Sequence, residues 1–107
     1  MMDARFLRNE MLWGKEGQAR LARAHVILFG LGGVGSYVAE CLARSGIGEL
    51  TLVDGDTVAL SNLNRQLEAL SSTIGLPKAE AVARRIAEIN PEAVLHPMQA
   101  LYNADNR

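Results

Sequence analysis

A cluster of two cationic and two amide side chains is the part of this sequence best suited to chemistry: Asn62, Arg65, Gln66 and Lys78. Arginine offers a planar fork of donors and lysine a mobile point charge, and both bind phosphate oxygens. Lys78 follows Pro77 at a predicted helix start, where the helix dipole disfavours a cation. That local cost favours an anionic partner such as a triphosphate, although a solvated loop with scattered charges is the alternative.

A glycine-rich loop precedes this cluster, with glycines at Gly30, Gly32, Gly33 and Gly35. It lies between a predicted strand and a predicted helix, which is the context that the dinucleotide fingerprint requires. Its glycines let the backbone approach a phosphate or ribose, and the helix N-terminus adds donors and positive potential. Asp54 ends the next predicted strand and can accept both ribose hydroxyls. The combination favours nucleotide binding over a simple tight turn beside a solvated aspartate, but it does not separate NAD from ATP.

The elements that must position these residues alternate between strands and helices. The apolar patterns predict strands at 25–29, 49–54 and 93–96, and helices from the glycine loop to about residue 44 and from 77 to 90. The first strand is a continuous apolar run, as expected of a strand buried on both faces. The predicted fold class is therefore α/β, a Rossmann-like doubly wound parallel sheet. The chain would supply its N-terminal portion of about three strands, preceded by helices.

Two domain segments follow from this reading. Residues 1–24 form an N-terminal helical segment, which Gly14 breaks, and residues 25–107 form the N-terminal half of a nucleotide-binding domain. The sequence stops where another helix is expected near 103–105, which favours a truncated domain. The polar connection at 55–76 is expected to be functional because of its length, with one helical turn near 65–70.

Helical periodicity predicts which helix faces are buried. The inner face of the helix after the glycine loop is predicted to hold Val34, Val38, Cys41, Leu42 and Ser45, with Cys41 as a small core residue rather than a nucleophile. The inner face of the later helix is predicted to hold Val82, Ala83, Ile86 and Ile89.

The composition is that of a globular domain: 107 residues, 49% hydrophobic, with a net charge of −1. This charge gives no overall electrostatic case for nucleic acid. The single cysteine excludes an internal disulfide and fits a reducing compartment. No apolar run approaches the roughly twenty residues of a membrane span, and the start lacks a signal-peptide pattern. We therefore expect a cytoplasmic protein with no membrane partner. His25 and His96 lack spaced ligand partners, so no metal site is predicted within the chain.

From Arg5 to about Glu92 the chain resembles the adenylating domain of the ubiquitin-activating-enzyme-like superfamily, whose bacterial members include the ThiF and MoeB proteins. The resemblance is carried by 5–9 (RFLRN), 30–35 (GLGGVG), 54–58 (DGDTV), 61–66 (SNLNRQ) and 75–78 (GLPK). Within the superfamily the chain is most similar to the TcdA branch, the tRNA threonylcarbamoyladenosine dehydratases. That similarity rests on Asn64 before Arg65-Gln66, on the opening around 8–9 and 12–14, and on the run 43–48 (ARSGIG).

The resemblance implies a role for each residue of the site. The glycine loop and Asp54 would hold adenosine, with Asp54 on the ribose. Arg65, Lys78 and Arg8 would be the catalytic residues, and Arg8 would reach across a two-fold dimer to the partner's ATP. The implied nucleotide-binding set is Gly30, Gly32, Gly33, Gly35, Asp54, Asn62, Arg65, Gln66 and Lys78, in which Asn62, Arg65 and Lys78 would contact the phosphates and Gln66 would support them.

The implied reaction is attack of a substrate carboxylate on the α-phosphate of ATP, which gives an acyl-adenylate and pyrophosphate. In the TcdA branch the carboxylate belongs to the threonylcarbamoyl group on adenosine of tRNA, and the activated carbonyl is then closed into a ring. The family's Mg²⁺-holding aspartate would lie after residue 107, so we expect the chain alone not to catalyse. The implied partners are a second copy in a homodimer and tRNA, with a sulfur-carrier protein or a cysteine desulfurase left open.

Three alternatives remain at this point. A ThiF- or MoeB-type enzyme would activate the C-terminus of a ubiquitin-like sulfur carrier. An NAD-binding oxidoreductase domain is compatible with Asp54, but Asn62, Arg65 and Lys78 would then have no role in binding the ligand. A non-catalytic adaptor would keep the fold and bind a partner without pyrophosphate release.

Overall fold

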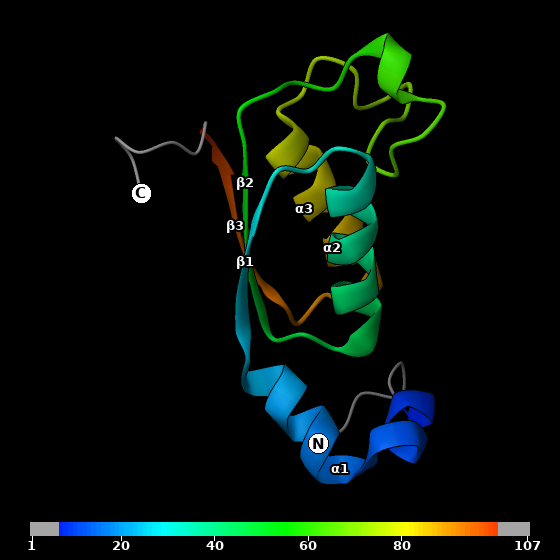
Figure 1. Cartoon of the computed structure of the whole chain (residues 1–107), viewed down its shortest axis with the longest axis vertical. Helices are drawn as coiled ribbons and strands as arrows, with labels where there is room; N and C mark the ends of the chain where they lie inside the picture. The colour runs from blue at the N-terminus through cyan, green and yellow to red at the C-terminus, as the bar shows by residue number, and fades with distance from the viewer. Residues whose placement is uncertain (1–6, 101–107) are drawn as a thin grey trace.

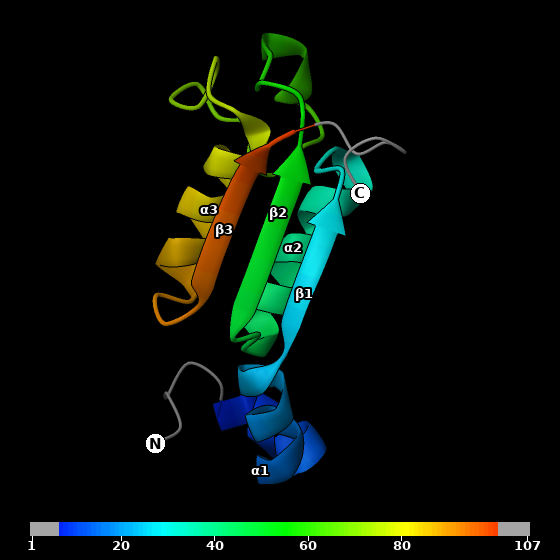
Figure 2. The same cartoon turned by 90° about the vertical axis from the view of Figure 1, so that its left-hand side faces the viewer.

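The computed structural model describes residues 7–100 as a parallel sheet backed by two helices. The elements are α1 (Leu7–Arg23), β1 (His25–Phe29), α2 (Gly33–Ser45), β2 (Glu49–Asp54), the 3₁₀ turn η2 (Leu60–Asn62), α3 (Lys78–Ile89) and β3 (Val94–Gln99). The three strands are parallel in the order β1-β2-β3. Both α2 and α3 lie on one side of the sheet, as the two views show (Figure 1, Figure 2). The predicted α/β class is confirmed.

The core lies between β2 and the two helices. Leu50 and Leu52 of β2 are fully buried, and they pack with Ile47 and Ile86. The predicted inner face of α3 is confirmed, because Val82, Ala83 and Ile86 are buried and Ile89 packs against the core cluster. Apolar residues spaced by three and four positions lie on one face of a helix, and that face is buried here. Within the described residues, no helix has both the length and the apolar character of a membrane span.

Strand β1 differs from the prediction of burial on both faces. Its exposure alternates along 25–29, with His25, Ile27 and Phe29 exposed and Val26 and Leu28 partly buried. The reason is that α2 and α3 cover only one face of the sheet, and nothing in the described residues packs on the other (Figure 2). The strand itself was predicted at the correct residues.

The buried face of α2 also differs from the prediction. Ser36, Ala39 and Ala43 are buried there, whereas Val34 is 81% exposed and Cys41 is exposed. Small residues at these positions allow the helix axis to approach the sheet closely. The predicted inner set is therefore wrong for Val34, Val38 and Cys41, and Leu42 alone of its large residues packs against the core.

Helix α1 is interrupted as the sequence predicts. Gly14 has φ 77° and ψ 167°, so two helices meet at a kink there. The C-terminal end of α1 is joined to the sheet, because Gly48 donates from its backbone nitrogen to the Leu21 carbonyl at 3.0 Å. The helix predicted near 103–105 lies outside the described residues.

An ion pair connects the two helices that carry the core. Arg85 of α3 hydrogen-bonds Glu40 of α2, and Arg44 lies 3.4 Å from the same carboxylate. The hydrogen bond from Arg85 holds the pKa of Glu40 below its usual 4.5, against the effect of burial, and the charges of Arg85 and Arg44 lower it further.

We expect this pair to stabilise the protein above pH 4.5 and to lose its effect at lower pH. The sign follows because a carboxyl with a lowered pKa in the folded state contributes stability while it is ionised, and the contribution disappears as pH falls through that pKa. Glu40→Gln should cost about 1 kcal/mol of unfolding free energy at pH 7, since the pair is partly exposed, and less at pH 3. Urea unfolding at both pH values measures this, and an equal cost at pH 3 would contradict it.

Candidate functional site

The candidate site lies at the carboxyl ends of the parallel strands. A hollow of about 270 Å³ opens there, lined by Phe29, Gly30, Val53, Asp54, Gly55, Asp56 and Ala100. Figure 1 shows the glycine loop (cyan) and the 55–77 connection (green to yellow) at this same end of the sheet. In open α/β sheets this is the edge at which ligands bind.

The glycine loop makes a turn that a side chain would prevent. Gly30 has φ 87°, which favours glycine, and its nitrogen donates to the Val53 carbonyl at 2.8 Å. The backbone then folds back so closely that a Cβ on Gly35 would lie 2.0 Å from the Gly30 carbonyl oxygen. Gly32 is the N-cap of α2 and provides no side-chain acceptor. The first amide groups of α2 are therefore available to an anion.

Asp54 connects the glycine loop to the end of β2. One carboxylate oxygen accepts from the Leu31 nitrogen at 2.6 Å, and the other accepts from the Asp56 nitrogen at 2.7 Å. The residue is only 8% exposed. Each carboxylate oxygen has two lone pairs, so acceptor capacity remains for a ribose hydroxyl. Asp54 thus has a structural role in shaping the loop that the sequence reading did not include.

Asp54→Asn is expected to destabilise the protein by about 2 kcal/mol. An asparagine supplies one acceptor oxygen, so its amide group would face one of the two backbone donors. Urea unfolding measures the loss, and Asp56→Asn is the matched control because the Asp56 side chain is exposed. Equal stability of the two variants would show that the loop does not depend on the Asp54 carboxylate.

The long 55–77 connection is held at both ends. Val58 donates to the Leu76 carbonyl at 2.8 Å, and the Lys78 nitrogen donates to the Asp56 carbonyl at 2.9 Å. Its helical turn is η2 at 60–62 rather than near 65–70. The reason lies in Asn62, whose side-chain oxygen accepts from the Ala59 nitrogen at 2.8 Å and fixes the earlier turn. Pro77 was predicted to be the first helical residue of α3. It is the N-cap instead, so the helix begins one residue later, at Lys78.

The predicted phosphate-binding residues are placed differently from one another. Gln66 is buried, and its amide nitrogen lies 4.0 Å from the Cβ position of Gly32, so it packs under the glycine loop. Lys78 is 7% exposed at the start of α3. Arg65 is exposed, and its described hydrogen bonds go to Ser61 and Asn64 of its own loop.

The remaining predicted residue, Arg8, lies in the first turn of α1, and its side chain is outside the described part of the chain. The structure therefore brings the glycine loop, Asp54 and Gln66 into one unit. Among the described contacts, Arg65 is not joined to that unit.

Glu68 is the residue at this site that sequence reasoning missed. It is 1% exposed, and neither of its carboxylate oxygens has a hydrogen-bond partner among the described residues. Burial raises the pKa of its carboxyl, as does the charge of Asp54, while its own backbone amide, Lys78 and Ser36 act in the opposite direction. The available signal was an acidic residue within the apolar run Leu67 to Leu70.

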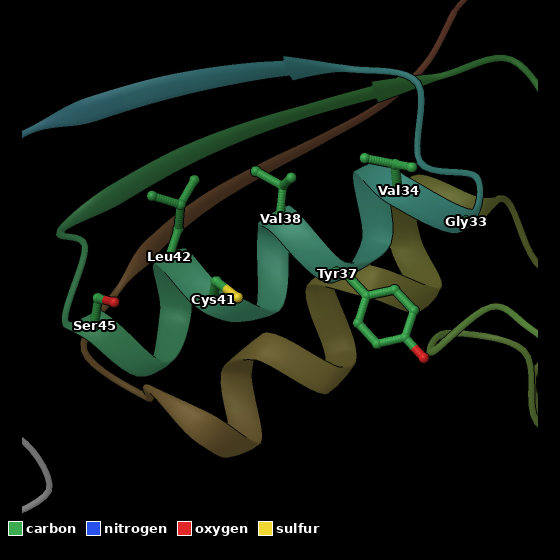
Figure 3. A pocket seen from close by; sticks show the side chains of 7 residues that line it. All are labelled: Gly33, Val34, Tyr37, Val38, Cys41, Leu42 and Ser45. Carbon is green, nitrogen blue, oxygen red and sulfur yellow. The ribbon is translucent and has the colours of Figure 1, made fainter.

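A second hollow, of about 550 Å³, lies along the exposed face of α2. It is lined by Gly33, Val34, Tyr37, Val38, Cys41, Leu42 and Ser45. Figure 3 shows Val34, Val38 and Leu42 on the strand side of the helix and Tyr37 on the other side. The lining is almost entirely apolar, so this hollow is unsuited to a phosphate. The hollow at the strand ends is therefore the better candidate for a phosphate-bearing ligand.

Solved structures with a similar fold include Escherichia coli tRNA N6-threonylcarbamoyladenosine dehydratase, TcdA, in complex with ATP. The TM-score is 0.93 with 45% identity, and the match covers 95% of this chain and 42% of that one. A complex of the same protein with AMP matches with the same TM-score and identity.

Curated relatives point in the same direction. The chain is 49% identical to the tRNA threonylcarbamoyladenosine dehydratase of Bacillus subtilis, over 94% of this chain and 39% of that protein. It is 43% identical to the molybdopterin-synthase adenylyltransferase of Salmonella typhimurium, over 84% of this chain and 36% of that protein. The chain thus spans less than two fifths of the length of these relatives. Because the ThiF family pattern matches residues 6–107, the chain belongs to the ThiF family.

Proposed function

We propose that the protein containing this chain uses ATP to adenylate a substrate carboxylate. The main support for the proposal is the arrangement of residues at the strand ends. Asp54 holds the glycine loop there through the Leu31 nitrogen. The 55–77 connection leads from the same strand end to Lys78, which is nearly buried. ATP is favoured over NAD because the cationic cluster after β2 suits a triphosphate. The ATP and AMP complexes of the E. coli relative support the same choice.

The substrate in this proposal is the threonylcarbamoyl group on adenosine of tRNA. A carboxylate oxygen of that group attacks the α-phosphorus, and the bond to pyrophosphate breaks. The activated carbonyl is then closed into a ring, and AMP leaves. Support comes from the relatives of higher identity, which are named as tRNA threonylcarbamoyladenosine dehydratases. The molybdopterin-synthase relative favours a second candidate substrate, the C-terminus of a sulfur-carrier protein.

The chain's own residues would bind and position ATP rather than form covalent bonds to it. Asp54 would accept the ribose hydroxyls, while Asn62, Arg65 and Lys78 would contact the phosphates. Gln66 would support the glycine loop from below, given its burial there. Phosphoryl-type transfer depends mainly on positioning and charge neutralisation, so such residues suffice without a protein nucleophile.

Magnesium and partners complete the proposal. The described residues contain no group of three or more His, Cys, Asp or Glu side chains that could hold a metal ion. Mg²⁺ bound with a nucleotide needs only one or two carboxylates besides the phosphates. Its ligand would lie outside this chain. We further propose a homodimer, in which Arg8 reaches the partner's ATP, and a cytoplasmic location, since the substrate is tRNA.

Pyrophosphate release by the full-length protein tests the proposal. We expect release from ATP with tRNA that carries threonylcarbamoyladenosine, and none with tRNA that lacks this modification. Release with a sulfur-carrier protein alone would favour the second candidate substrate. Calorimetric binding of NAD without binding of Mg-ATP would overturn the proposal, and intact ATP binding without pyrophosphate release on any of these substrates would favour an adaptor.

A further inference from the structure

Two hydrogen bonds through one buried side chain join α1 to the last residue of α2, and the proposed reaction gives them no task. The Trp13 indole nitrogen donates to the side-chain oxygen of Gln18 at 2.9 Å. The side-chain nitrogen of Gln18 in turn donates to the Ser45 carbonyl at 2.8 Å. Gln18 is 2% exposed, so its amide group has exchanged water for these two partners. A buried polar group with satisfied hydrogen bonds holds its partners in one arrangement.

Trp13 and Gln18 lie on opposite sides of the kink in α1. Gly14 separates a first helical segment, 7–13, from a second, 15–23, and we call the first segment the arm. A glycine leaves such a kink free to take many angles unless contacts across it select one. The Trp13 ring makes a second such contact, because a Cβ on Gly17 would lie 3.0 Å from its Cδ1 atom. The direction of the arm is therefore set by contacts that Trp13 makes with the second segment.

The second segment is fixed to the rest of the fold. The Gly48 nitrogen, just before β2, donates to the Leu21 carbonyl at 3.0 Å. A Cβ on Gly48 would lie 1.8 Å from the Ala22 carbonyl oxygen, so the two backbones touch there. Because Gln18 also bonds the end of α2, the second segment is held by both the sheet and the helix. The arm takes its orientation from this fixed base.

The arm lies far from the glycine loop of its own chain. Both views show α1 beyond the amino ends of the strands, whereas the glycine loop follows the carboxyl end of β1 (Figure 1, Figure 2). Helix α2 runs between the two ends with 13 residues, and at 1.5 Å per residue it is about 20 Å long. No side chain spans that length, so an arm held near Ser45 cannot serve its own nucleotide loop.

The surface of the arm indicates that a second copy of the chain is its partner. Met11 is 85% exposed and Leu12 is 78% exposed, and they precede the partly exposed Trp13. Consecutive large apolar side chains at a surface are typical of a protein interface. The same arm carries Arg8 in its first turn. If the arm docks on a second copy, it brings an arginine to that copy.

We propose that Gln18 is a positioning residue for the nucleotide site of a second copy. It holds Trp13, and so fixes the arm in the direction in which Arg8 reaches the ATP of that copy. The inference rests on the proposed function, which assigns Arg8 to the partner's ATP. A displacement of about 1 Å in an element that contacts substrate can cost about 100-fold in rate. Loss of the Gln18 contacts should therefore be felt in the other chain.

Subunit mixing in the full-length protein tests this, with pyrophosphate release from ATP and modified tRNA as the readout. Gln18→Leu keeps the approximate size of the side chain but removes both hydrogen bonds, and it should lower release by about 10- to 100-fold in the homodimer. A heterodimer of one Gln18→Leu chain and one Lys78→Ala chain should regain about half of the wild-type rate, since one of its two equivalent sites is intact.

The reverse pairing gives the opposite expectation. A chain that carries both Gln18→Leu and Lys78→Ala, paired with a wild-type chain, should be nearly inactive, because the wild-type site receives the misplaced arm. Damage confined to the variant's own chain would leave that wild-type site working and would give no recovery in the first heterodimer. Either of these two results would overturn the inference.

Trp13→Phe keeps the test decisive if Gln18→Leu does not fold. It removes only the indole N–H, so Gln18 keeps its bond to Ser45. Amide hydrogen exchange in the full-length protein should become faster at 7–13 and stay at the wild-type rate at 15–29. Ser45→Ala is the matched control, since Gln18 bonds the backbone carbonyl there, and it should change neither exchange nor activity.

Unchanged exchange at 7–13 in Trp13→Phe would show that the hydrogen bond does not fix the arm, and the inference would fail. A wild type that releases no pyrophosphate would instead contradict the proposed function, and the exchange measurement would still decide whether these contacts hold the arm.

Discussion

Replacing Lys78 by alanine is expected to lower kcat/KM for adenylation by about 30- to 1,000-fold in the full-length protein. The range corresponds to about 2–4 kcal/mol of transition-state stabilisation, as found when one charge contact to a developing anion is removed. The loss should be large because the amine is nearly buried, so its charge is poorly screened by water. The rate of pyrophosphate release with modified tRNA measures it.

This loss should occur without loss of stability. Lys78 opens α3, where the helix dipole disfavours its charge, and alanine is the better helix former. The matched control is Lys15→Ala, which removes the chain's other lysine from an exposed position in α1. Wild-type kcat/KM in Lys78→Ala would remove this lysine from the phosphate site, and an equal loss in Lys15→Ala would point to an effect of net charge.

Patterns that depend on neighbours in the sequence predicted the fold well. The strand at 49–54 was predicted at its observed bounds, because apolar and β-branched residues there end at a single aspartate. The break at Gly14 and the inner face of α3 were also predicted correctly. Each of these features depends on local conformation or on a helical period, which a sequence displays directly.

Features that depend on distant packing were not predicted. The face of α2 was assigned to its large apolar residues, yet Ala39 and Ala43 are buried, since close approach to the sheet selects small side chains. Glu68 was overlooked because only the tertiary structure shows that its side chain is buried. The structure likewise assigns Asp54 to the glycine loop, a contact across 23 positions that no local pattern reveals.

Gly35→Ala is expected to have the largest structural effect at the site. A Cβ there would lie 2.0 Å from the Gly30 carbonyl oxygen and 3.0 Å from its carbon, both backbone atoms that cannot move without shifting the loop. The shift would disturb the hydrogen bond from Leu31 to Asp54. We expect a loss of about 2–3 kcal/mol of unfolding free energy. ATP affinity should fall at least about 100-fold, because displacement of a binding element by 1 Å can have that effect.

Gly33→Ala is the matched control for Gly35→Ala, because it adds a methyl group to the same loop without a clash against the Gly30 carbonyl. Gly33 is the first residue of α2, it has no positive φ, and nothing lies within 4 Å of its Cβ position. Alanine there should therefore leave the melting temperature unchanged or raise it slightly, since it reduces the freedom of the unfolded chain. A melting temperature lowered equally in both variants would show that the loop tolerates no side chain at all. Wild-type stability in Gly35→Ala would mean that the loop relaxes around the new methyl group, and the close turn at Gly30 would then not be what shapes the nucleotide site.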